Sequence, residues 1–231
     1  MKKTLLALVI VAALGVSQVA YATPVTVDYE DTQKNWATWT PTTNASLDVV
    51  GSPEFLTTSV TMDDSQLLAI KFNALYLNNF VTSGDLFIDA NADQDWDYVV
   101  SALGTALNGT TTLNLYEIMV GLDEGNAYTM SYYGSAPEDY RAGHPVGLNF
   151  VPVGPSIGSV SYTAVNGSFI EFDFGANSPL HFNNDFIIGY TVTCANDVIY
   201  QQVPVPEPGT FAMLGAGLLG LGLFARRKKQ L

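Results

Sequence analysis

Apolar and polar residues alternate in short runs along most of this chain, and no stretch shows a convincing helical period. Runs rich in Val, Ile, Thr, Tyr and Phe are separated by Gly, Asn, Asp and Pro, a pattern typical of strands joined by turns. We therefore predict strands over residues 25–29, 55–62, 67–77, 85–89, 112–120, 127–133, 160–165, 168–174 and 186–194.

The clearest local signal is a hairpin over residues 160–174. Asn166 and Gly167 separate two strand-like runs there, and this dipeptide suits a type I′ turn. Many short strands at such spacing predict an all-β fold, an antiparallel β-sandwich, with a jelly roll as one form of it. No internal repeat is visible, so residues 23–203 are treated as one β-rich domain. The proline-rich segment 151–155 is either a loop that crosses between sheets or a subdomain boundary.

The first 22 residues have the three regions of a secretory signal peptide. A positively charged start is followed by a 12-residue apolar run, and Ala20 and Ala22 then fit the cleavage pattern A-x-A. We expect signal peptidase to remove residues 1–22 and to leave Thr23 as the new N-terminus.

Acidic residues dominate the chain between its two ends. Of the 22 acidic and nine basic residues, 21 acids but only three bases lie between residues 23 and 206, a formal charge of −18. Nucleic acid and anionic lipid surfaces repel a body of this charge, which argues against nucleic-acid partners. Cys194 is the single cysteine, so no internal disulfide can form. It ends an apolar run, and we expect a small, unreactive core residue.

Residues 204–231 form a separate unit at the C-terminus. Residues 209–225 carry no charge, and as a helix they would reach about 25 Å. That length is just short of a hydrocarbon core of about 30 Å, so the segment spans a membrane marginally. The four basic residues that follow are Arg226, Arg227, Lys228 and Lys229. By the positive-inside rule they stay cytoplasmic, which places the acidic body on the far side of the inner membrane.

Directly before this span stand Pro206, Glu207 and Pro208, and the two prolines keep the glutamate on an extended strip. Motif, short span and basic end, in this order, resemble the PEP-CTERM sorting signal of Gram-negative bacteria. The resemblance covers residues 204–231 only. It implies that an exosortase, an integral-membrane protease-like enzyme, cleaves near the motif and passes the protein to the cell surface or the exopolysaccharide matrix. The other interpretation is a plain membrane anchor on a proline-rich stalk.

The segment DANADQDWDYV at residues 89–99 is the strongest candidate for a metal site. Its polar side chains at every second position are Asp89, Asn91, Asp93, Asp95 and Asp97. This spacing resembles the calcium loops of EF-hand and dockerin type, and ligands that are all oxygen favour calcium over zinc or copper. Gln94 stands where such a loop has glycine, and Val100 stands where a bidentate acid would close it. The alternative is a solvated acidic turn.

A hydrolase motif in the chain has the wrong context. Residues 154–158 match G-x-S-x-G, and Asp173 and His181 follow in the matching order. The nucleophile elbow needs a strand before its serine and a helix after it, but here a proline precedes Ser156 and a strand-like run follows. We therefore interpret Ser156 as a turn residue. His144 and His181 lack the spacing of a zinc site.

These features together predict a non-enzymatic, exported surface protein with a structural or interaction role in the envelope or biofilm matrix. Its precursor is expected in the inner membrane, its mature form at the cell surface, and exopolysaccharide among its partners. A glycan-binding or adhesive module is the first alternative, which the aromatic-rich segment 131–147 with Arg141 would suit, although a loop folded over a core edge is the simpler explanation of that segment. A secreted polysaccharide-active enzyme is the second alternative.

Overall fold

The computed structural model describes residues 23–32, 52–75, 77, 81–118, 146–148, 153–205 and 217–218. Ten β-strands make up most of this part of the chain. They are β1 (Val25–Glu30), β2 (Glu54–Asp63), β3 (Gln66–Leu75), β4 (Leu86–Asp89), β5 (Tyr98–Val100), β6 (Gly109–Ile118), β7 (Val153–Val165), β8 (Phe169–Asp173), β9 (Phe186–Thr191) and β10 (Val198–Val203).

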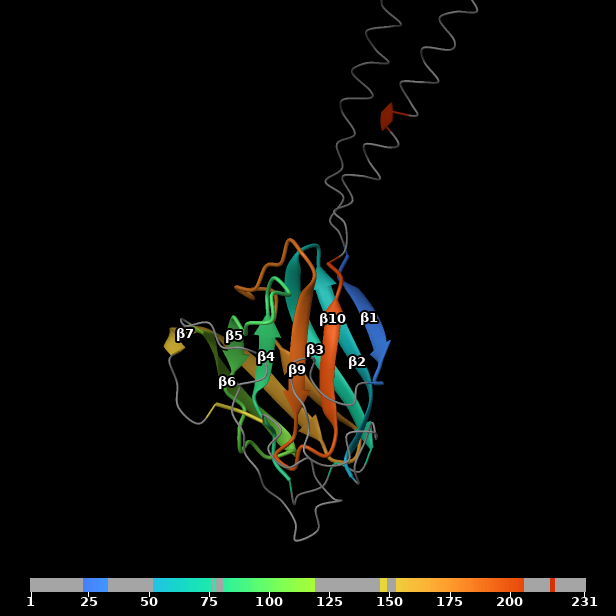
Figure 1. Cartoon of the computed structure of the whole chain (residues 1–231), viewed down its shortest axis with the longest axis vertical. Coiled ribbons are helices and arrows are strands. Elements are labelled where there is room, and N and C mark those ends of the chain that lie inside the picture. Colours follow the sequence, from blue (N-terminus) through green and yellow to red (C-terminus); the bar gives the residue numbers. More distant parts are fainter. Residues whose placement is uncertain are drawn as a thin grey trace, which may run out of the picture.

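All ten strands form one antiparallel sheet in the order β1-β2-β3-β8-β7-β6-β5-β4-β9-β10. Strands β4 to β8 are a continuous meander, which β3 extends by pairing with β8 and β9 extends by pairing with β4. The sheet folds over itself, so that β10 lies against β2 (Figure 1). The predicted all-β antiparallel fold is confirmed, and its two layers belong to a single, nearly closed sheet.

An aromatic stack at the centre of the core joins the two layers. Phe72 on β3 lies flat against Tyr190 on β9, with 4.5 Å between ring centroids and 3° between ring planes. Phe172 on β8 meets both rings edge-on, at 6.1 Å from Phe72 and 5.5 Å from Tyr190. Aromatic rings bury large apolar areas in such arrangements, so this stack contributes strongly to holding the layers together.

Strands β4 and β9 are buried on both faces. Leu86 and Ile88 of β4 belong to the main core, whereas Phe87 packs on the outer face in a second apolar cluster. The buried members of this outer cluster are Phe87, Trp96, Val99, Ile118, Ile187 and Val198. A continuous apolar run, without alternation, is the pattern expected of a strand covered on two sides.

Strand β7 begins at Val153, seven residues before the start predicted for it, so the proline-rich segment is not wholly a loop. Its register against β6 shifts on both sides of the pair Tyr116 and Ser156. Pro155 lies next to these irregularities, where the ladder tolerates a residue without an N–H group. The early start of β7 was not predicted, because proline more often marks a loop than a strand.

The hairpin between β7 and β8 is confirmed, but its predicted turn type is wrong. The N–H group of Ser168 donates to the carbonyl of Val165 at 2.9 Å. Gly167 has a φ of 74°, and Asn166 is not among the residues with positive φ. A type I′ turn requires positive φ at both central residues, whereas positive φ at the second alone fits a type II turn.

Eight of the predicted strands match β1, β2, β3, β4, β6, β7, β8 and β9. Strands β5 and β10 were not predicted. The strand predicted over residues 127–133 lies outside the described residues, as do the signal peptide and the sorting tail apart from residues 204–205 and 217–218. Gly217 and Leu218 are helical, and no helix in the described part of the chain is long and apolar enough to cross a membrane.

Candidate functional site

The acidic segment forms the loop between β4 and β5, and its backbone is wrapped around the side chain of Asp89. Asp89 is fully buried, and its Oδ1 accepts N–H groups from Asn91 at 3.1 Å and Ala92 at 2.7 Å. Its Oδ2 accepts the N–H group of Gln94 at 2.9 Å. Since a buried carboxylate is costly unless it is hydrogen-bonded, these contacts make Asp89 a structural centre of the loop.

The spacing of every second residue produces a series of turns. Asn91 Oδ1 accepts the N–H group of Asp93 at 3.0 Å, and Asp93 Oδ1 accepts that of Asp95 at 3.1 Å. The amide of Asn91 also donates to Asp93 Oδ2 at 3.0 Å. Short polar side chains bond the backbone two residues further on in this way, so the pattern has a structural explanation that requires no metal.

Gln94 occupies the position at which calcium loops of this spacing have glycine. Its φ is 76°, and that of Ala92 is 57°. Both values lie in the left-handed region, which costs residues with a side chain about 1–2 kcal/mol. The loop therefore adopts the backbone that glycine would favour, and the hydrogen bonds to Asp89 hold it there.

Asp97 closes the loop at its far end. Its Oδ2 accepts the N–H group of Ala90 at 2.7 Å. Burial raises the pKa of Asp97, and the negative charges of Asp89, Asp93 and Asp95 raise it further, while the bond from Ala90 opposes the rise. The loop therefore concentrates negative charge that a cation would relieve.

In the described residues, no group of three or more His, Cys, Asp or Glu side chains is placed to hold a metal ion. Asn91, Asp93 and Asp95 are exposed, whereas Asp89 is turned inward onto the backbone. Calcium binding by this loop stays a prediction.

Trp96 anchors the acidic loop to the sheet, a role that was not predicted from the sequence. The indole is 1% exposed, 5.4 Å from the ring of Phe87, and meets Tyr200 on β10 edge-on at 6.5 Å. It thus covers the outer face of β4 and β10. The sequence does contain a signal for this role, namely a tryptophan inside an otherwise polar segment. A large apolar side chain in such a segment is expected to pack against an apolar surface of the protein.

Asp85 is a second buried carboxylate, at the other end of β4, and it too was missed. Its Oδ1 accepts the N–H groups of Ala102 and Leu103, and its Oδ2 accepts that of Leu148, all at 2.8 Å. Burial raises the pKa of Asp85, and the three N–H groups oppose this. A side chain at Gly147 would put its Cβ 2.8 Å from the carboxylate, so glycine is needed for this close approach.

The serine of the G-x-S-x-G match lies inside β7, so the interpretation of Ser156 as a turn residue is wrong. Its hydroxyl oxygen lies 2.8 Å from the carbonyl oxygen of Gly158 and 3.2 Å from that of Leu115, and its one proton is donated within this pair. Asp173 accepts the N–H group of Gly175 at 2.8 Å, and His181 is exposed beside Gln66. A serine within a strand is not on the strand-to-helix turn that a nucleophile elbow requires.

The expectation that Cys194 is buried is confirmed. It is 5% exposed, and its thiol donates to Asn196 Oδ1 at 2.6 Å. Burial raises the pKa of this thiol to about 11, so little thiolate forms at neutral pH. Its low reactivity stays a prediction.

Comparison with protein families identifies one part of the chain. Residues 204–229 match the family model of the PEP-CTERM protein-sorting motif, which confirms the resemblance read from the sequence. Neither a curated protein nor a solved structure matches the chain. The chain thus carries a PEP-CTERM sorting motif. The motif residues Pro206, Glu207, Pro208 and Arg226 to Lys229 lie outside the described residues, as do Ala20, Ala22 and His144.

Proposed function

We propose that this protein is exported, held briefly in the inner membrane by its tail, and released to the cell surface when an exosortase cleaves near Glu207. The match of residues 204–229 to the sorting motif carries the proposal. The fold supports it, because β10 ends at Val203 and the motif begins at the next residue. A processing enzyme would therefore meet the motif directly after the folded body.

The body has a structural or interaction role in the envelope or biofilm matrix, with exopolysaccharide among its partners, and it is not an enzyme. Its strong negative charge keeps its surface hydrated and disfavours nucleic acid, because like charges repel. A single, nearly closed sheet around a large apolar core suits a protein that works outside the cell without a disulfide.

The test is the distribution of the chain in a host that has an exosortase. Wild type should leave the inner membrane, whereas Glu207→Ala and a deletion of residues 226–229 should leave precursor there. Glu30→Ala is the matched control, because it removes an exposed glutamate from the folded body, and it should be released like wild type. Release of the Glu207→Ala variant at the wild-type level would contradict the proposal.

A further inference from the structure

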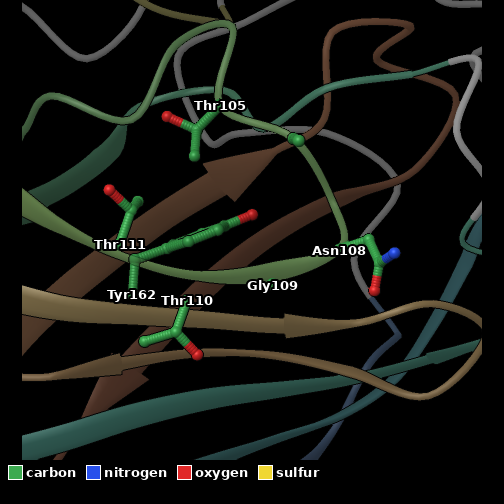
Figure 2. Close-up of a pocket in the computed structure, with 7 residues that line it drawn as sticks. Thr105, Asn108, Gly109, Thr110, Thr111 and Tyr162 are labelled. Atoms are coloured by element: carbon green, nitrogen blue, oxygen red, sulfur yellow. The ribbon is translucent and has the colours of Figure 1, made fainter.

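Two features of the described surface are candidates for a binding surface, a hollow beside the start of β6 and the free edge of β1. The hollow is lined mainly by polar residues, among them Asn108 and Thr110, which are exposed (Figure 2). Water already pairs with such groups, so they offer a ligand little gain. On β1, by contrast, Val25 is 49% exposed and Val27 is 41% exposed. Covering these valines removes apolar surface from water, which favours β1.

β1 is an edge strand. It stands at one end of the sheet and, within the described part of the chain, pairs only with β2. Figure 1 shows it at the margin of the body, beyond β2. Its register against β2 runs without a shift from Val25 to Glu30. A regular edge strand presents a row of N–H and C=O groups to which a further strand can be added.

The pairing with β2 determines which backbone groups of β1 point outward. The N–H group of Asp31 donates to the carbonyl of Leu56 at 3.0 Å, and β1 pairs with β2 in this same register. In an antiparallel ladder, hydrogen-bonded pairs recur at every second residue. The odd-numbered residues of β1 therefore bond to β2, and the even-numbered ones direct their N–H and C=O groups to the free edge. These even-numbered residues are Thr26, Asp28 and Glu30.

The core face of β1 is apolar and only partly covered. Val25 lies opposite Met62 and Val27 lies opposite Val60, and both of these β2 residues are buried. Residues directly opposite one another share a face of the sheet, so the two valines are on the core side. The strand of the opposite layer, β10, lies against β2. The core face of β1 thus extends beyond its cover and remains exposed.

The outer face of β1 is acidic. Asp28 and Glu30 are exposed there, and the residues opposite them on β2 are the neutral Ser59 and Thr57. An added strand would place its own side chains directly beside these two acids, where basic residues are favoured and acidic residues are repelled. A second copy of this chain would bring the same acids and the same charge of −18 between residues 23 and 206, so self-pairing is disfavoured.

We propose that β1 binds an extended segment of a partner protein in which apolar and basic residues alternate, added antiparallel to its free edge. The backbone of this segment pairs with Thr26, Asp28 and Glu30. Its apolar side chains cover Val25 and Val27, and its basic side chains lie beside the two acids. The inference goes beyond the sorting proposal, because sorting depends on residues 204–229 and β1 lies at the other end of the body.

The test uses the exported protein and a fluorescent heptapeptide that alternates valine and lysine. The anisotropy of this peptide should rise to saturation as protein is added. A scrambled peptide of the same composition is the control for charge alone and should bind at least tenfold more weakly, because it cannot place all its valines on one face. A peptide that alternates valine and glutamate should not bind.

Methylation of the peptide backbone tests the pairing itself. Lysines beside Asp28 and Glu30 occupy hydrogen-bonded pairs, so their N–H groups point to β1, whereas the valine N–H groups point away. N-methylation of the lysines should therefore abolish binding, and N-methylation of the valines should preserve it. Both peptides carry the same charge, and the protein is unchanged.

Proline substitution tests the edge from the side of the protein. Thr26→Pro removes an N–H group that faces the free edge and keeps both acids, so it should weaken binding at least tenfold and change the Tm little. Val27→Pro is the control for orientation, because the N–H group of Val27 bonds to β2, and it should lower the Tm.

A charge variant tests the acidic face. Asp28→Asn combined with Glu30→Gln should weaken peptide binding about tenfold, since two charge pairs are lost. Asp95→Asn combined with Glu117→Gln is the matched control, which removes two exposed acids from other parts of the body and should weaken binding much less.

The absence of binding by the alternating peptide overturns the inference. Equal binding of the scrambled peptide, or of the peptide methylated at its lysines, also overturns it, because either result indicates diffuse charge attraction. A dimer of the protein in sedimentation velocity that Thr26→Pro dissociates would show that a second copy occupies the edge, contrary to the proposal. None of these results bears on the release of the protein by an exosortase.

Discussion

The carboxylate of Asp85 accepts the backbone N–H group of Leu148 at 2.8 Å, across 63 residues of chain. The same side chain accepts the N–H groups of Ala102 and Leu103, so one buried carboxylate joins three separate segments. Asp89 performs a similar task at the other end of β4, where it organises the acidic loop. The two ends of this short strand are therefore held by buried aspartates.

Asp85→Ala should destabilise the fold strongly. The change leaves three buried or half-buried N–H groups without their acceptor, and we expect a loss of about 3 kcal/mol in the free energy of unfolding. Urea denaturation measures this. Asp28→Ala, at an exposed position of β1, is the control and should cost less than about 0.5 kcal/mol. Equal effects of the two changes would show that Asp85 does not hold these segments together.

Stability should also depend on pH through Asp85 and Asp97. Burial raises the folded-state pKa of both carboxyls above the ordinary value of 3.8, so the folded protein binds these protons more readily than the unfolded chain. The stability that proton binding by these two carboxyls contributes is therefore fully present below pH 3.8. It is lost as the pH rises through their folded-state pKa values. Denaturation of wild type and of the Asp85→Asn, Asp97→Asn double variant from pH 3.5 upward should show the wild type losing stability relative to the variant. A constant difference across this range would refute the assignment.

Gln94→Gly should stabilise the acidic loop. Gln94 has a φ of 76°, which glycine adopts without steric cost, so we expect a gain of about 1 kcal/mol. Thermal unfolding measures the change. Gln201→Gly, the same substitution within β10, should instead destabilise by about 1 kcal/mol, because glycine weakens a strand. A loss of stability at both positions would mean that the left-handed backbone at Gln94 carries no strain.

Strand patterns could be read from the sequence because alternation is a local property. The runs around Val60 and Phe72, for example, show which side chains face the core. The partners of Asp85 and Trp96 could not be read in this way, since they lie on other strands and loops and depend on the closed sheet. The spacing from Asp89 to Asp97 was recognised, but its role as a series of backbone turns required the geometry of the loop.

The calcium hypothesis is tested by the Tm of the exported protein. Millimolar calcium should raise the Tm if it binds only the folded state, and magnesium at equal concentration should raise it less. Asp93→Ala combined with Asp95→Ala removes two exposed carboxylates and should abolish the difference. Equal shifts with both ions, or a shift that survives the double change, would indicate charge screening without a site.

The intact mass of the surface-released protein tests the central proposal most directly. In a host with an exosortase, the released form should begin at Thr23 and should lack residues 211–231, including the four basic residues, because cleavage falls near Glu207. A released form whose mass includes Arg226 to Lys229 would contradict exosortase processing, whatever the role of the body.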